Sequence, residues 1–265
     1  MIEIMQKCKP ALSSRTDPSW LNQVQPAYCR DTVCQVNLRK DRFSGNLGIG
    51  GQDKTSSNAV VQPANSSRQI SQQSVSTMHI PDLQASVRRG QKTVLQLQPG
   101  HQRLKVCFGW NVKDARCDVD ASALMLTNTG RVPNDDWFVF YGSPQSPDHS
   151  VKIVNSSALD RQVIEVDLDL LNTEVQKIAF VLTINEAFEN KLHFGMLSDV
   201  YIRVLECNTN KELVSFKPEE LFPSITSMTI AELYMHNGQW KFNPVGNGVN
   251  KDLAGQCAVY GVEIC

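Results

Sequence analysis

Residues 178–184 read IAFVLTI, a run without a charged side chain. A strand with this composition is apolar on both faces, so it must be covered on both sides and should be a central strand of its sheet. The neighbouring run EVDLDLL (165–171) instead alternates acidic and apolar residues. That alternation predicts a strand with one face in solvent. Together the two runs predict a sheet with a buried face and a solvated face.

Similar short runs, rich in β-branched and aromatic residues, recur from about residue 83 to the C-terminus. Turn signals such as PG, NTG, SPD and HNG separate them, and Asn237-Gly238 suits a type I′ hairpin turn. About ten strands without a long amphipathic helix indicate an all-β fold, an antiparallel sandwich or barrel. The runs are TVLQLQ (93–98), LKVCFGW (104–110), ALMLT (123–127), WFVFYG (137–142), VIEVDL (163–168), KIAFVLTI (177–184), VYIRVLE (200–206), ELVSF (212–216), MTIAELYMH (228–236) and WKFNPV (240–245).

The N-terminal part has a different composition. Residues 44–80 are rich in Ser, Gln, Asn and Gly and poor in aromatic residues, so they cannot bury enough apolar surface to offset the entropy of ordering. We expect a flexible linker there. Residues 1–43 contain one Trp, one Tyr and one Phe, too little for a core, and form a mostly unstructured N-terminal extension. The predicted organisation is extension 1–43, linker 44–80 and β domain 83–265.

Charge and composition exclude several classes of protein. Residues 1–80 hold nine Lys/Arg and five Asp/Glu, a net +4, whereas the remaining 17 Lys/Arg and 22 Asp/Glu give −5. A mildly acidic folded part argues against a nucleic-acid groove. No run approaches the roughly 18 apolar residues of a transmembrane helix, and the N-terminus lacks the apolar core of a secretory signal. We expect a cytoplasmic protein without direct membrane insertion, whose cysteines are free thiols.

Asp118 and Asp120 stand at the front of the apolar run CDVDASALML (117–126). Asp is a poor strand former, and a charge carried into a core is costly unless it is paired. Residues two apart on a strand point the same way, so both carboxylates can converge on one cation. The alternative is a solvated turn in which the carboxylates accept hydrogen bonds from nearby backbone N–H groups. The residues alone leave both interpretations open.

The order of these segments resembles the TerD family of bacterial tellurium-resistance and stress-response proteins. The similarity runs colinearly from about residue 83 to residue 262, through DASALML, FVFYG, QKIAFVLTI and ELYMHNGQWKFNPVGNG. It implies a β-sandwich of two antiparallel sheets without known catalysis. It further implies acidic loops that bind Ca²⁺ at one end of the sandwich. The partners it implies are other Ter-type stress proteins, in complexes at the inner face of the membrane.

The implied metal ligands are only partly present. The loop that is long and acidic in the family is reduced to NSSALDR (155–161), with Asp160 its one carboxylate, and Trp137 stands where the family has an acid. Fewer charges generally mean weaker Ca²⁺ binding. The chain therefore resembles a divergent, TerA-like member that has lost part or all of its calcium. The candidate ligands are Asn111, Asp118, Asp120, Asp135 and Glu186.

Two functions remain open at this stage. The first is a non-enzymatic stress-response module whose loops are stabilised by Ca²⁺. The second is a metal-independent scaffold that recruits partners through its N-terminal segment. The five His residues are scattered without an HExxH pattern, and no motif points to an enzyme or to a small-molecule substrate.

Overall fold

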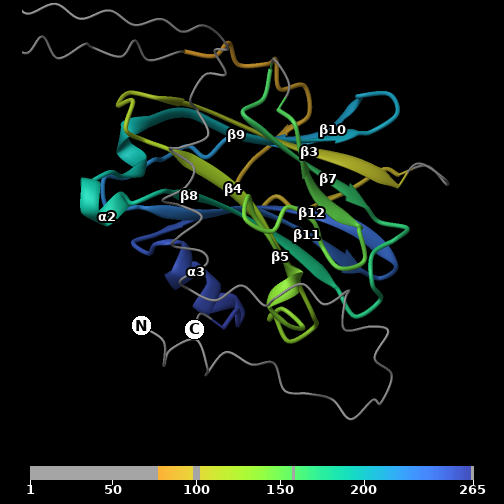
Figure 1. The fold of residues 1–265 in the computed structure, drawn as a ribbon. Coiled ribbons are helices and arrows are strands. Elements are labelled where there is room, and N and C mark those ends of the chain that lie inside the picture. Colours follow the sequence, from red (N-terminus) through yellow and green to blue (C-terminus); the bar gives the residue numbers. More distant parts are fainter. Residues whose placement is uncertain (1–76, 98–101, 157–158, 264–265) are drawn as a thin grey trace, which may run out of the picture.

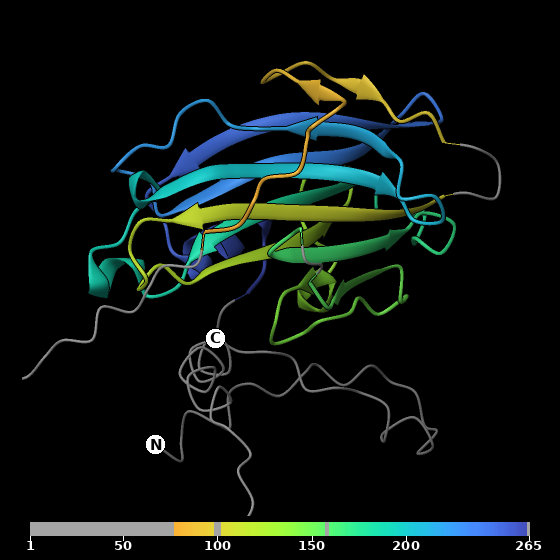
Figure 2. The same cartoon turned by 90° about the horizontal axis from the view of Figure 1, so that it is seen from above.

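The computed structural model describes residues 77–97, 102–156 and 159–263. These residues form two six-stranded sheets packed face to face, as Figures 1 and 2 show from two directions. The predicted extension and most of the predicted linker lie outside the described residues. In spatial order, sheet A contains β1 (Ser86–Val87), β10 (Glu212–Phe216), β9 (Leu197–Glu206), β3 (Arg103–Val112), β7 (Gln162–Asp167) and β6 (Val151–Val154). Sheet B contains β2 (Thr93–Val94), β12 (Gln239–Val249), β11 (Ser227–His236), β8 (Lys177–Ile184), β4 (Val119–Leu126) and β5 (Phe138–Val139).

The all-β sandwich predicted from the sequence is confirmed. Strand β8, which holds the IAFVLTI run, pairs with β11 on one side and β4 on the other, and every residue after Lys177 in it is buried. The two sheets are antiparallel throughout, except for the two-residue parallel pairing of β1 with β10. The apolar run therefore lies inside the sheet, where its composition requires it to be.

The core follows the alternation of the strands. In β3, Leu104, Val106 and Phe108 are fully buried and point between the sheets, while the intervening residues face outward. The type I′ turn predicted between β11 and β12 is also present, because Asn237 and Gly238 both have positive φ, 51° and 71°. The turn fixes the pairing of His236 with Gln239.

The C-terminal helix α3 (Leu253–Tyr260) is an element that the sequence does not predict. Asp252 caps its first turn by accepting a hydrogen bond from the Gly255 N–H at 2.7 Å, and Gly261 ends it with φ 81°. Tyr260 and Thr229 of β11 are joined by a hydrogen bond of 2.9 Å between their hydroxyl groups. The helix therefore covers part of sheet B. None of the helices in the described part of the chain is long and apolar enough to cross a bilayer.

The outer face of sheet A depends on one glycine. Gly109 of β3 lies directly opposite Tyr201 of β9, and a Cβ at position 109 would stand 2.2 Å from the Tyr201 ring. The missing side chain leaves room for the tyrosine to lie across the sheet and become almost completely buried. Gly109 thus determines where the Tyr201 hydroxyl group points.

We predict that Gly109→Ala lowers the free energy of unfolding by about 1–3 kcal/mol, because the new methyl group overlaps a packed ring. Urea denaturation measures this loss. The matched control is Gly109→Ala in a Tyr201→Ala background, where the ring is gone and the penalty should shrink. An equal penalty in both backgrounds would contradict the assigned clash.

Candidate functional site

Three of the predicted ligands lie at one end of the sandwich. Asp118 immediately precedes β4, and its carbonyl oxygen accepts a hydrogen bond of 2.8 Å from the Asn185 N–H at the end of β8. Asp120 pairs with Thr183 across the same two strands. Glu186 follows Asn185 directly, so its backbone lies at the same end of these two strands.

Glu186 is held in an unusual conformation. It has a left-handed backbone, φ 47°, and stands at the N-terminus of the single-turn helix α2 (Ala187–Asn190). Its carboxylate accepts a hydrogen bond of 3.2 Å from the Asn190 side-chain amide. Its exposed carboxylate therefore already has a partner within its own loop.

Asn111, the proposed neutral ligand, is occupied by other contacts. Its Oδ1 accepts a hydrogen bond from the Met78 N–H at 2.8 Å, and its Nδ2 donates to the Met78 carbonyl and to Asp199 Oδ2, both at 3.2 Å. Lys217 Nζ lies 3.0 Å from the other Asp199 oxygen. The hydrogen bonds from Lys217 and then Asn111 lower the pKa of Asp199 below its ordinary value. We call the pairing of Asn111 with Met78 the clasp.

Asp135 lies apart from the other candidates. It begins the 3-10 helix η3 (Asp135–Trp137), which follows the C-terminal end of β4, whereas Asp118 precedes the N-terminal end. At about 3.3 Å per residue, β4 separates the two by roughly 25 Å. The Asp135 carboxylate accepts a hydrogen bond of 2.8 Å from the Glu263 N–H, so it holds the C-terminal segment.

The predicted ligands thus do not converge on one ion. Among the described residues there is no group of three or more His, Cys, Asp or Glu side chains placed to hold a metal. Calcium usually takes about six to eight oxygens. Asp118, Asp120 and Glu186 could supply at most part of that set, with water completing the shell. The residues do not fit the full calcium site that the resemblance implies, and Ca²⁺ binding by these three stays a prediction.

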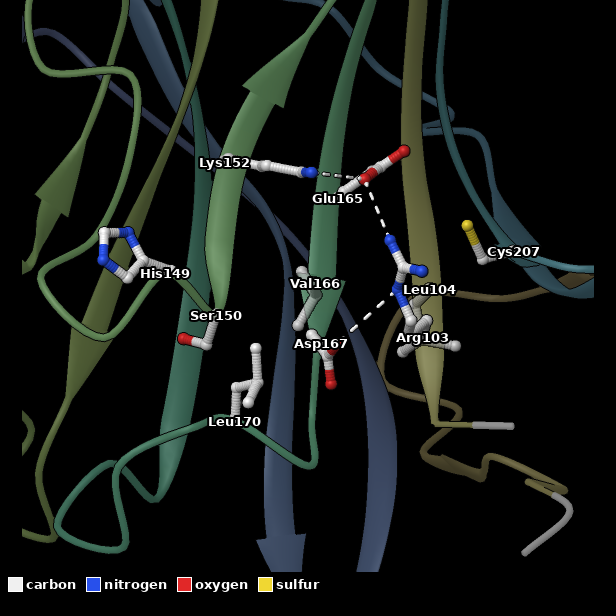
Figure 3. A pocket seen from close by; sticks show the side chains of 10 residues that line it. All are labelled: Arg103, Leu104, His149, Ser150, Lys152, Glu165, Val166, Asp167, Leu170 and Cys207. Carbon is white, nitrogen blue, oxygen red and sulfur yellow. Dashed lines mark ion pairs between the residues drawn. The ribbon is translucent and has the colours of Figure 1, made fainter. Parts of the chain in front are cut away.

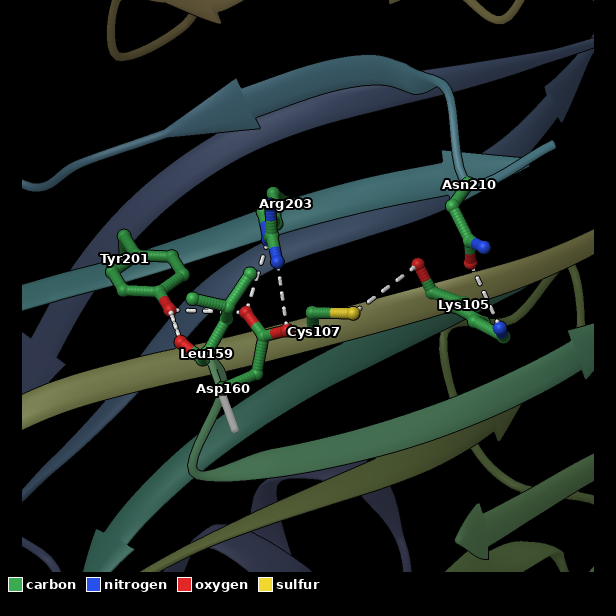
Figure 4. Close-up of polar contacts among 7 residues, drawn as sticks. All are labelled: Lys105, Cys107, Leu159, Asp160, Tyr201, Arg203 and Asn210. Atoms are coloured by element: carbon green, nitrogen blue, oxygen red, sulfur yellow. Dashed lines mark hydrogen bonds and ion pairs between the residues drawn. The ribbon is translucent and has the colours of Figure 1, made fainter. Parts of the chain in front are cut away.

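The remaining carboxylate of the shortened loop has a structural partner. Asp160 is 2% exposed, and Arg203 of β9 holds it with two hydrogen bonds, from Nε at 3.0 Å and from an Nη at 2.8 Å. The Tyr201 hydroxyl group donates to the Leu159 carbonyl at 2.7 Å and also lies 3.0 Å from Asp160 Oδ1. Figure 4 shows these side chains together on the outer face of sheet A. Asp160 therefore neutralises an arginine of the sheet.

Burial at this cluster alters three pKa values. It raises the pKa of Tyr201, and the nearby Asp160 charge adds to the effect. Burial alone would lower the pKa of Arg203, but the hydrogen bonds to Asp160 outweigh the effect of burial, and the pKa of Arg203 is raised. It also raises the pKa of Cys107 to about 12, with the Asp160 charge as a second cause. Cys107 is thus a protonated thiol at neutral pH and a poor nucleophile.

The roles of Tyr201 and Arg203 were not predicted from the sequence. The signal was present, because VYIRVLE places one cation inside an apolar strand and the opposing loop has one carboxylate. Pairing the two would have required the knowledge that the loop folds over β3 and β9. Gln162 was missed for the same reason: its side-chain amide pairs with Ala121 N–H and carbonyl, at 2.7 and 3.0 Å, and joins the two sheets.

A hollow of about 100 Å³ lies over β7, near β6 and β3 (Figure 3). Arg103 lies 3.7 Å from Glu165 and 3.5 Å from Asp167, while Lys152 lies 3.1 Å from Glu165. Each cation therefore already faces a carboxylate, and the arginine and lysine are about half exposed. Because these exposed positive and negative side chains balance each other, the hollow has no preference for binding an anion or a cation.

The TerD domain family matches residues 83–260. The chain belongs to the TerD family. Tellurium resistance protein TerD of Serratia marcescens is 33% identical over 182 residues, which cover 66% of this chain and 95% of that protein. General stress protein 16U of Bacillus subtilis (strain 168) is 30% identical over 189 residues, covering 68% and 98%.

Two other proteins align over a smaller part of this chain or at lower sequence identity. Tellurium resistance protein TerA of Alcaligenes sp is 31% identical over 126 residues, 48% of this chain and 35% of that protein. A crystal structure of a homologue of telluride resistance protein (TerD) from Streptomyces coelicolor A3(2) aligns with a TM-score of 0.44 and 18% identity, covering 62% of this chain and 97% of that one. The family match begins at residue 83, so residues 1–82 lie outside the family domain.

We predict that Asn111→Asp opens the clasp. A carboxylate at position 111 cannot donate to the Met78 carbonyl, and it would face the Asp199 carboxylate. Hydrogen exchange should become faster at the Met78 amide, and the free energy of unfolding should fall by about 1–3 kcal/mol.

The control is the double variant Asn111→Asp with Asp199→Asn. This exchange restores one donor and one acceptor between the two side chains, so it should recover part of the lost stability. Unchanged exchange at Met78 in the single variant would show that the clasp does not hold this segment.

Proposed function

We propose that this protein is a non-enzymatic stress-response module of the TerD family whose action does not depend on Ca²⁺. The proposal rests on the contacts that the candidate ligand side chains make within the protein. Asn111 holds Met78, Asp135 holds the C-terminal segment and Asp160 holds Arg203. These three side chains, and Glu186 with Asn190, are thus engaged in internal contacts rather than grouped around a common point.

Relatives named for tellurium resistance and general stress support the stress-response part of the proposal. We infer that the protein acts in the cytoplasm, by binding other Ter-type stress proteins in a complex at the inner face of the membrane. The extension and linker precede the family domain, so they are the natural region for recruiting such partners.

The state of two buried cysteines favours a binding role over thiol chemistry with tellurium compounds. Burial raises the pKa of both Cys107 and Cys257 to about 12, with nearby carboxylates adding to the effect. Thiols that stay protonated at neutral pH react slowly, because the thiolate is the nucleophile. These two cysteines are therefore poor candidates for reducing or trapping an oxidant.

The competing candidate is a Ca²⁺-stabilised module, favoured by the position of Asp118, Asp120 and Glu186 at the same end of β4 and β8. Carboxylate oxygens are the ligands that Ca²⁺ prefers, so these residues could contribute to a weak site. In that case Ca²⁺ would raise the melting temperature, because a ligand of the native state stabilises it.

We predict that calorimetric titration of the full chain with Ca²⁺ releases no binding heat, and that a chelator leaves the melting temperature unchanged. The comparison variant is Asp118→Ala with Asp120→Ala, and the matched control is Asp169→Ala with Glu174→Ala on an exposed loop. A binding heat that disappears in the first variant but persists in the control would establish the calcium site and overturn the metal-independent proposal.

We also predict that partner capture depends on the N-terminal extension. Arg39→Glu, Lys40→Glu and Arg42→Glu change its charge without altering the described domain. Pull-down of co-expressed Ter-type proteins should weaken severalfold relative to the unmodified chain. Equal capture by the variant and the unmodified chain would indicate that partners bind the sandwich instead.

A further inference from the structure

Residues 77–87, here called the arm, cross the outer side of sheet A before the sandwich proper begins. In Figure 2 the arm is the orange segment that runs over the sheet toward β1. From Thr77 to Ile80, and again from Asp82 to Val87, exposed residues alternate with partly buried ones, and Pro81 is buried between the two stretches. Such a period of two is typical of an extended peptide that presents alternate side chains to a surface.

Both ends of the arm are held through their backbone. At the first end the clasp pairs the Met78 N–H and carbonyl with the Asn111 side chain. At the other end, the Ala85 N–H donates to Glu212 Oε1 at 2.8 Å, and Ser86 and Val87 pair in parallel with β10. Backbone pairing of this kind does not require a particular side chain on the bound segment.

Beside the clasp, two apolar side chains of the arm fill a shallow groove. Met78 and Ile80 lie against a surface that Gly109 and the Tyr201 ring form on β3 and β9. Because Gly109 has no side chain, the Tyr201 ring can lie across it, and the arm packs beside that ring. The groove thus combines backbone clamps with contacts for alternate apolar side chains, which are the two parts of a peptide-binding site.

We propose that this groove is a binding site for an extended peptide, and that it accepts the arm of a second copy of the chain in place of its own. The segment that the structure shows to fit is residues 77–87 themselves, so another copy presents the matching chemistry. The contacts of Met78, Ile80, Ala85 and Val87 would be the same in either arrangement. Residues 88–92, with Gly90 at φ 77°, form the turn that would act as the hinge of this exchange.

The test uses the full chain with Met78→Pro, which removes the N–H that donates to Asn111 but leaves the groove intact. A fluorescent peptide of residues 77–87 is titrated by anisotropy into this variant and into the unmodified chain. The peptide should bind the variant more tightly, because the tethered arm competes at high effective concentration. Adding Asn111→Ala should weaken peptide binding about tenfold or more, the loss expected for two hydrogen bonds.

Adding Asn185→Ala, the same chemical change at the same end but away from the groove, should leave peptide binding unchanged. Absence of binding to a Met78→Pro protein whose arm exchanges hydrogen rapidly would overturn the proposal. If the arm stays protected from hydrogen exchange in that variant, a second variant that lacks Gln91 and Lys92 provides the test. The shortened hinge should prevent the arm from reaching its own groove and produce a dimer by light scattering, whereas a monomer would refute exchange between copies.

Discussion

The buried ion pair of Asp160 and Arg203 is the constraint around which the outer face of sheet A is organised. A guanidinium group on a strand, 11% exposed, requires a compensating charge, since an unpaired buried ion is strongly destabilising. The shortened loop before β7 supplies that charge with its one carboxylate. The same loop offers a carbonyl oxygen to Tyr201, whose ring lies across Gly109. The ring and the glycine are part of the surface on which the arm rests, and the loop holds the ring in place.

This arrangement links the fold to the proposed function. The acids that the TerD resemblance assigns to calcium are distributed over both ends of the sandwich, and Asp135 and Asp160 are engaged with other parts of the chain. Asn111 provides a donor and an acceptor at once, which a carboxylate cannot, and this is the chemistry needed to pair with a backbone amide. In this sandwich, Asn111, Asp135 and Asp160 therefore fasten segments of the chain itself.

Much of the fold follows from the sequence, because apolar runs and turn residues are local signals. The central position of β8 and the hairpin at Asn237-Gly238 were predictable for that reason. Helix α3 was not, since its eight residues carry no strong amphipathic pattern. The candidate site was predicted less well, because pairings such as Asp160 with Arg203 join residues far apart in sequence. Residues 77–80, assigned to the linker by composition, lie against the sandwich through contacts that composition does not reveal.

A double-mutant cycle on Asp160→Asn and Arg203→Met tests the central claim most directly. Asn keeps a hydrogen-bonding group near Tyr201, and Met keeps most of the arginine's apolar stem. Each single change leaves one buried partner without its counter-charge, whereas the double change removes both charges. Urea denaturation should give a coupling free energy of at least about 2 kcal/mol between the two positions. Losses that add to within about 0.5 kcal/mol would contradict the account.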